Sequence, residues 1–287
     1  MEQVKIIECP RDAMQGIKTF IPTESKVNYI QSLLRVGFDT IDFGSFVSSK
    51  AIPQMADTAE VLAHLDLSKT SSKLLAIIAN TQGAKLASAH KEIQYLGFPF
   101  SISENFQMRN THKTIAESLV TLQEILEIAY KSNKEVVTYI SMGFGNPYGD
   151  VWNVDVVAEW TEKLSKLGVK ILSLSDTVGS STHEVIDYLF SNLIPQYPTI
   201  EFGAHLHTTP EKWFEKIDAA YKAGCRRYDG AIQGFGGCPM AKDELTGNMP
   251  TEKLLSYFTQ QKANTNTSPM SFESAYNVAT SLFGTFH

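Results

Sequence analysis

The feature that most constrains this chain is an alternation of strand-like apolar runs with amphipathic helical segments, repeated from one end of the sequence to the other. Each strand-like run is short and apolar, and the helical segments between the runs carry apolar residues at helical spacing. Eight such β-then-α units within about 250 residues favour a (β/α)₈ TIM barrel over an open sheet. The expected strands are 4–7, 40–43, 74–78, 93–98, 135–140, 170–174, 199–204 and 227–231.

Glycines mark the joints between units. Gly37, Gly168 and Gly224 each follow a predicted helix and precede a predicted strand, where a left-handed helix cap is expected. No Pro- or Gly-rich linker divides the chain. We therefore predict one domain over residues 1–287, with a barrel over about 4–250 and a C-terminal region, 251–287, that adds further helices packed against it.

The composition of the chain limits the kinds of partner and compartment that it suits. The chain has 287 residues, a formal net charge of −6 and scattered lysines, so nucleic acid is not an expected partner. Three cysteines without paired spacing suit a reducing compartment. The N-terminus passes almost directly into a strand, and no apolar run approaches membrane-spanning length. We expect a cytoplasmic protein that makes no contact with a membrane.

A His-x-His pair, His205 and His207, ends the seventh predicted strand. Alternate side chains of a strand point to the same face, so the two imidazoles project together, about 6–7 Å apart at the backbone. That spacing suits two nitrogens that converge on one metal ion. The structural alternatives are two hydrogen-bonded core histidines and a pair on a solvated edge.

Other polar and ionisable residues gather where the predicted strands end. In barrels of this kind the chemistry lies at the carboxyl ends of the strands and in the loops after them. A purely structural barrel has no reason to collect carboxylates, imidazoles, a guanidinium and a thiol at one rim. These residues are Arg11, Asp12 and Gln15 after the first strand, Asp42 and Ser45 at the second, Asp176 after the sixth, and Cys238 and Asn248 after the eighth.

The motifs, in this order, resemble the 3-hydroxy-3-methylglutaryl-CoA lyases, members of a TIM-barrel metallolyase group related to isopropylmalate synthase. The resemblance covers roughly residues 4 to 260, and it implies a metal-dependent lyase that cleaves 3-hydroxy-3-methylglutaryl-CoA, or a close 3-hydroxyacyl-CoA, to acetoacetate and acetyl-CoA. The matching segments are Pro-Arg-Asp-x-x-Gln at 10–15, Ser-Phe-Val-Ser at 45–48, Pro-Gln-Met at 53–55, Ser-Asp-Thr-x-Gly at 175–179, His-x-His at 205–207 and Gly-Gly-Cys-Pro at 236–239.

The resemblance implies one divalent metal held by Asp12, His205, His207 and Asn248. Oxygen and imidazole ligands without a thiolate suit Mg²⁺ or Mn²⁺, with Zn²⁺ and Co²⁺ as competitors. For Asp12 the alternative is a strand-end cap or an ion pair with Arg11. For Asn248 it is a turn residue after the preceding glycine.

The resemblance also implies catalytic roles. Arg11 matches an arginine that stabilises the enolate released by cleavage, and Cys238 matches a cysteine on a glycine-rich loop that donates a proton to that enolate. Asp176 matches an active-site aspartate, with a helix N-cap as its alternative. Asp42 stands where the lyases carry a glutamate, and the base is expected to be Asp42, or His205 assisted by Asp176. The expected substrate contacts are Arg11, Gln15, Lys18 and Ser45.

Some positions depart from the family pattern. The lyases usually have glycine where this chain has Cys9, Gly-Leu where it has Ala13-Met14, and asparagine where it has His112. Two other functions stay open. One is a Claisen-type condensing enzyme related to isopropylmalate or citramalate synthase, and the other is a catalytically decayed barrel that binds acyl-CoA. The resemblance also implies a homodimer and a place in leucine degradation.

Overall fold

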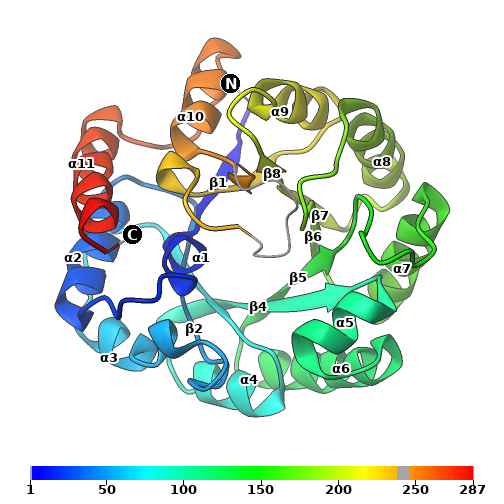
Figure 1. The fold of residues 1–287 in the computed structure, drawn as a ribbon, viewed down its shortest axis with the longest axis horizontal. Helices are drawn as coiled ribbons and strands as arrows, with labels where there is room; N and C mark the ends of the chain where they lie inside the picture. Colours follow the sequence, from blue (N-terminus) through cyan, green and yellow to red (C-terminus); the bar gives the residue numbers. More distant parts are fainter. Residues whose placement is uncertain (1, 238–245, 287) are drawn as a thin grey trace.

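A closed barrel of parallel strands forms the centre of the molecule, with helices around it (Figure 1). The computed structural model describes residues 2–237 and 246–286. All eight barrel strands lie on runs predicted as strands, so the (β/α)₈ fold is confirmed. In pairing order they are β1 (Lys5–Glu8), β2 (Thr40–Ser45), β3 (Lys73–Ile77), β4 (Ile93–Ser101), β5 (Glu135–Ser141), β6 (Ile171–Ser175), β7 (Glu201–His205) and β9 (Arg227–Gly230), and β9 closes the ring against β1.

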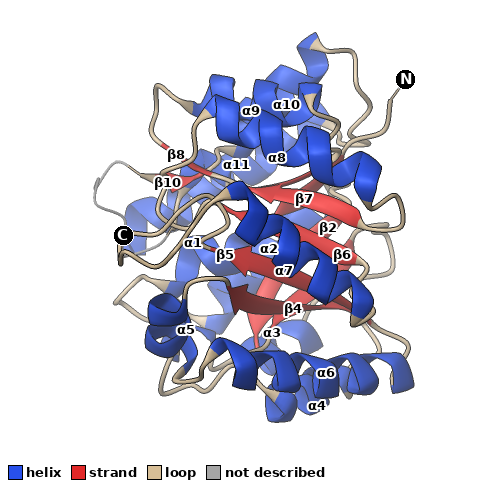
Figure 2. Ribbon diagram, turned by 90° about the vertical axis from the view of Figure 1, so that its right-hand side faces the viewer, coloured by secondary structure: helices blue, strands red, loops and turns tan. Residues whose placement is uncertain are grey.

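The outer ring consists of amphipathic helices whose buried faces pack on the strands (Figures 1 and 2). Among the described residues, no helix is both long and apolar enough to cross a membrane. The helices are α2 (Thr23–Leu34), α3 (Thr58–Ala63), α4 (Thr81–Ser88), α6 (Ile115–Lys131), α7 (Val154–Lys166), α8 (His183–Gln196), α9 (Trp213–Lys222), α10 (Thr251–Gln260) and α11 (Pro269–Phe286).

Several short elements of the structure are not predicted from the sequence. Two short helices follow barrel strands, α1 (Pro10–Gln15) after β1 and α5 (Glu104–Thr111) after β4. Single 3₁₀ turns occur at Pro53–Met55 and Ile232–Gly234. The helix α8 runs as far as Gln196, because buried apolar residues continue along its inner face.

The C-terminal helices pack against the barrel, as predicted. α11 lies beside α2 (Figure 1). Tyr29 of α2 meets Phe283 of α11 edge to face, with ring centroids 5.8 Å apart. The joint glycines are also confirmed as left-handed, since Gly37 has φ +92°, Gly168 φ +100° and Gly224 φ +98°.

A second, two-stranded ladder lies at one end of the barrel. β8 (His207–Thr208) pairs antiparallel with β10 (Gly247–Asn248), and Asn248 stands opposite His207. The His-x-His pair is therefore divided, since His205 ends β7 and His207 begins β8. Figure 2 shows this ladder at the end of the barrel toward which β4 and β5 point. The pairing brings a residue from beyond the last barrel strand to the histidines.

Candidate active site

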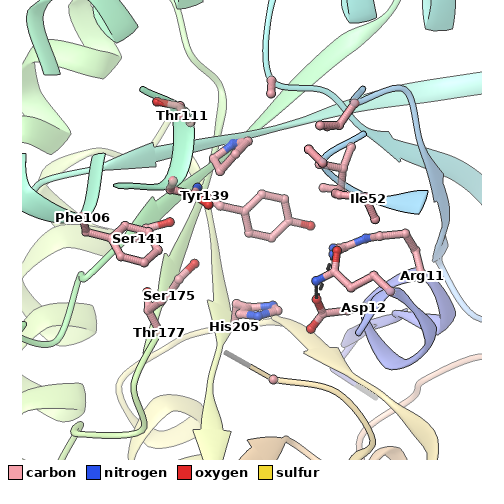
Figure 3. Close-up of a pocket in the computed structure, with 18 of the residues that line it drawn as sticks. Arg11, Asp12, Ile52, Phe106, Thr111, Tyr139, Ser141, Ser175, Thr177 and His205 are labelled. Carbon is pink, nitrogen blue, oxygen red and sulfur yellow. Dashed lines mark hydrogen bonds and ion pairs between the residues drawn. The ribbon is translucent and has the colours of Figure 1, made fainter. Parts of the chain in front are cut away.

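A pocket of about 370 Å³ opens at the carboxyl end of the barrel (Figure 3). The rings of Tyr139 and His205 and the head of Arg11 face the same central space. Five residues predicted from the sequence line this pocket: Arg11, Asp12, Gln15, His205 and His207. The rest of the lining is mainly apolar or neutral, with Val47, Ala51, Ile52, Ile77, Ala79, Pro99, Phe106, Asn110, Thr111, Tyr139, Ser141, Ser175, Thr177 and Gly237.

Three predicted metal ligands converge at one side of the pocket. Asp12 comes from α1, His205 from the end of β7 and His207 from the start of β8, and their ligand atoms all lie within 4.8 Å of one another. The two imidazole centroids are 5.2 Å apart. A carboxylate oxygen and two ring nitrogens at such spacing form a donor set that a divalent ion accepts.

Hydrogen bonds through Nδ1 fix the direction of both imidazoles. Nδ1 of His205 lies 3.0 Å from Oδ2 of Asp229, and Nδ1 of His207 lies 3.1 Å from the carbonyl oxygen of Thr177. Nε2 of His207 is buried and has no hydrogen-bond partner among the described residues. A buried polar atom without a partner is costly, so this nitrogen fits a metal ligand better than a core histidine.

Protonation states of the two rings follow from their surroundings. Burial, with a smaller contribution from the nearby His205, lowers the pKa of His207 to about 4, so the His207 ring is neutral at pH 7. Neutral imidazole is the form that binds metal. Burial also opposes charge on His205, but its hydrogen bond to Asp229 raises the pKa of His205 above the ordinary value.

Asn248 lies at the edge of the three ligands. Its side chain is buried, and its Nδ2 donates to Oδ2 of Asp12 at 2.7 Å and to the carbonyl oxygen of Phe235 at 2.8 Å. Because Asn248 lies within β10, the alternative of a turn residue is wrong. The neighbouring Gly236 has φ +86°, and a Cβ there would lie 2.5 Å from the carbonyl oxygen of Asp12. The segment before residue 238 thus passes directly against the ligands.

Arg11 bridges two buried carboxylates beside the ligands. Its Nη1 donates to Oδ1 of Asp12 at 2.8 Å, and its Nε donates to Oδ2 of Asp42 at 3.0 Å. Nε2 of Gln15 also donates to Oδ1 of Asp12, at 2.7 Å. The Arg11–Asp12 ion pair, one of the alternatives that the sequence leaves open for Asp12, is therefore present. It forms part of the site, so it does not exclude Asp12 as a metal ligand.

The two carboxylates differ in acidity. Burial, the largest single cause, would raise the pKa of Asp12, but Arg11, the two histidines and the hydrogen bond from Asn248 together outweigh it and leave that pKa below its ordinary value. At Asp42 burial dominates and raises the pKa to about 6, although Arg11 opposes the shift. The pair thus combines a carboxylate that stays ionised with one that titrates near neutrality.

Several predicted residues do not line the pocket. Ser45 is buried at the end of β2, where its hydroxyl donates to the carbonyl oxygen of Ile77 at 3.3 Å. Lys18 is exposed on the segment after α1. Asp42 lies behind Arg11 rather than in the lining. Cys238 lies outside the described residues.

Asp176 is placed differently from either expectation. It does not line the pocket, and the N-cap of α8 is Thr182 instead. Asp176 also does not assist His205 through its side chain, because the His205 ring is held by Asp229. The Asp176 carboxylate binds Lys216 on α9, with an Oδ2–Nζ distance of 2.7 Å.

Sequence reasoning missed three buried residues at or beneath this site: Asp229, Lys216 and Tyr139. For Asp229 a signal existed, since a carboxylate two residues before the end of the eighth predicted strand, 227–231, lies near the rim that carries the other strand-end residues. Tyr139 meets the His205 ring edge to face, with centroids 5.7 Å apart. Its hydroxyl is buried and has no hydrogen-bond partner in the part of the chain that the structure describes. Lys216 carried no signal, because a helix lysine is usually solvated.

Comparison with known proteins finds similarity along almost the whole chain. A family model described as HMGL-like matches residues 3–278. The cytoplasmic 3-hydroxy-3-methylglutaryl-CoA lyase of Rattus norvegicus is 32% identical over 267 residues, which cover 92% of this chain and 76% of the rat protein.

Solved structures show the same likeness. The HMG-CoA lyase of Brucella melitensis is 29% identical, with a TM-score of 0.91 and coverage of 98% of this chain and 99% of that one. An HMG-CoA lyase from Acinetobacter baumannii, solved with coenzyme A and 3-methylmalate, is 28% identical, with a TM-score of 0.89 and coverage of 98% of this chain and 92% of that one.

Proposed function

The chain belongs to the HMGL-like family, and on this premise we propose that it is a carbon–carbon lyase acting on 3-hydroxy-3-methylglutaryl-CoA or a close 3-hydroxyacyl-CoA. The products would be acetoacetate and acetyl-CoA. The observation that carries the proposal is the convergence of Asp12, His205 and His207 beside Arg11 at one pocket. A relative solved with coenzyme A supports an acyl-CoA as the ligand.

Four side chains would hold a divalent cofactor, Mg²⁺ or Mn²⁺. They are Asp12, His205 and His207, with Asn248 joining through its Oδ1. When bound, such an ion supplies positive charge that polarises the substrate's oxygens and lowers the pKa of its C3 hydroxyl. The ring of His207 is neutral, and its Nε2 has no partner among residues 2–237 and 246–286, so no proton must be removed before it binds.

Asp42 is our proposed base for the C3 hydroxyl proton. With a pKa of about 6 it is mostly ionised at pH 7 and still basic enough to take a proton. Arg11 covers its oxygens and separates Asp42 from the pocket, so Asp42 takes this proton only if the Arg11 side chain moves aside when substrate binds. His205, whose Nδ1 is held by Asp229, is the second candidate, and in that role its Nε2 would not be a metal ligand.

The remaining steps concern the bond between C2 and C3. As this bond breaks, its electron pair moves to C2 and gives the enolate of acetyl-CoA, while C3 becomes the ketone of acetoacetate. Arg11 points into the pocket, where its guanidinium would stabilise the enolate oxygen. We assign the proton that then adds to C2 to the thiol of Cys238, which follows the pocket-lining residue Gly237.

The test is a product assay with purified protein and 3-hydroxy-3-methylglutaryl-CoA. We expect acetoacetate in the presence of Mg²⁺ or Mn²⁺, and its loss after chelation with recovery when metal returns. Absence of product with every divalent metal would reject this substrate. Thiol release from acetyl-CoA and a 2-oxo acid would identify a condensing enzyme, and acyl-CoA binding without turnover would identify a decayed barrel.

We further propose that residues 1–287 form one catalytic domain, that the enzyme is a cytoplasmic homodimer, and that it serves leucine degradation. A rat relative named as a cytoplasmic lyase supports the location. Sedimentation of the purified protein tests the dimer, and a monomer at micromolar concentration would reject it.

A further inference from the structure

A buried lysine joins the segment that carries the two histidines to the loop after β6. Lys216 lies on α9 and has no exposed surface. Its Nζ donates to Oδ2 of Asp176 at 2.7 Å, to the carbonyl oxygen of His207 at 2.7 Å and to the carbonyl oxygen of Gly179 at 3.2 Å. These three acceptors satisfy all three hydrogens of the ammonium group, so the charge is both paired and hydrogen-bonded in the interior.

Asp176 extends this connection into the loop between β6 and α8. Its Oδ1 accepts from the backbone N–H of Ser181 at 3.0 Å, and its own backbone N–H donates to the carbonyl oxygen of His205 at 2.9 Å. The next residue, Thr177, supplies the carbonyl oxygen that lies 3.1 Å from Nδ1 of His207. The loop is therefore fixed to the backbone of one histidine and to the ring of the other.

The same loop meets the strand that carries Asn248. Gly179 has φ +73°, and a Cβ there would lie 2.5 Å from Cγ2 of Thr246. Thr246 leads directly into β10, in which Asn248 pairs with His207. Lys216 thus binds a carbonyl group of each of two segments, 176–181 and 205–208, that surround the His207 ring.

We propose that Lys216 is a positioning residue for the metal centre. Its ammonium group holds the 176–181 loop against His207, so that Thr177 directs Nε2 of His207 toward the ion. Asp176 is the carboxylate that pairs with Lys216, and it does not line the pocket. The inference rests on the proposed function for the identity of the site, but it concerns metal affinity and ring orientation rather than turnover.

The chain offers a matched control in Lys26. This lysine is also buried, its Nζ lies 2.6 Å from Oδ1 of Asp57, and it donates to the carbonyl oxygen of Gln54. It therefore has the same kind of partners as Lys216, a carboxylate and a backbone carbonyl, but it contacts none of the metal ligands. Lys26→Met and Lys216→Met both leave a carboxylate without its positive partner, and both should lower the melting temperature.

The decisive measurement is Mn²⁺ affinity, by calorimetry or by the EPR signal of free Mn²⁺. We expect Lys216→Met to weaken Mn²⁺ binding about 10–100-fold, the usual cost of losing a group that orients a ligand, and Lys26→Met to stay within about twofold of the unaltered protein. The double variant Lys216→Met with Asp176→Asn leaves no unpaired charge. It should regain melting temperature but keep weak binding. Wild-type affinity in that folded double variant would overturn the proposal.

Ring orientation gives a readout that does not depend on metal. In metal-free protein the ¹⁵N shifts of His207 should show a single tautomer with hydrogen on Nδ1, and Lys216→Met should show a mixture of tautomers. If the unaltered protein binds no Mn²⁺, the proposed metal centre is wrong. The ¹⁵N shifts then remain as the test of whether Lys216 orients the His207 ring. An unchanged single tautomer in Lys216→Met would then overturn the positioning role.

Discussion

The two ends of the barrel both carry charged clusters, and the contrast between them shows what distinguishes a site from a structural network. At the amino end, Nζ of Lys5 lies 2.8 Å from Oε2 of Glu201, and the buried Arg227 approaches Glu201 at 3.5 Å. None of these residues lines the pocket. At the carboxyl end, Arg11 and Asp12 form an equally close pair, but both border the pocket. Access to a cavity, rather than charge alone, separates the two.

The contrast is sharpest for Arg11. Replacement by Met should lower turnover by on the order of 100–1,000-fold, because one donor aimed at a developing oxyanion typically contributes that much. Mn²⁺ binding should persist, since a guanidinium has no lone pair with which to bind a cation. Acetoacetate release and Mn²⁺ titration measure the two effects separately. Unchanged turnover would show that Arg11 has no catalytic role. Its ion pair with Asp12 would then be purely structural, like the ion pairs at the amino end.

Asp229 tests whether a carboxylate beneath the rim belongs to the site. Asp229→Asn removes the charge that holds Nδ1 of His205, and it should weaken Mn²⁺ affinity about 10–100-fold. Calorimetric titration measures this loss. If the Mn²⁺ affinity stays within twofold, Asp229 is not needed to orient His205, and the functional site includes only residues that line the pocket.

The acidity of Asp42 predicts a pH dependence. A base must be ionised, so kcat/KM should fall as pH drops through about 6, by about tenfold for each unit below that value. Asp42→Asn should lower activity and abolish this acidic limb. A limb that survives in Asp42→Asn would assign it to another group, with His205 the next candidate.

The smallest effect is expected at the amino end. Lys5→Met removes a partly exposed ion pair, in which Lys5 is 32% and Glu201 33% exposed, and such pairs contribute about 0.2–1 kcal/mol. Turnover and Mn²⁺ affinity should not change. Urea unfolding measures the stability, and a tenfold loss of activity would show that the two ends of the barrel are coupled.

Local signals in the sequence account for the fold. Strand runs are short and apolar, helix faces repeat at helical spacing, and Gly37, Gly168 and Gly224 occupy positions that favour glycine. The rim residues Asp12 and His207 were predictable because strand ends in a barrel share one edge. These predictions need only the order of residues along the chain.

What the sequence does not reveal is which residues meet across the interior. Lys216 lies on a helix, where most lysines are solvated, and only the folded chain brings it to Asp176. Ser45 fits the family motif, yet its hydroxyl binds the Ile77 carbonyl, because a buried strand-end hydroxyl takes the nearest acceptor. β10 has too few residues to produce a periodic pattern.

The placing of Gly236 against Asp12 and of Asn248 against His207 has a consequence for substitution. A side chain at position 236, or a change in the pairing of β10 with β8, would displace one of these residues directly. The two flanks of residues 238–245 are therefore constrained by Asp12 and His207 themselves.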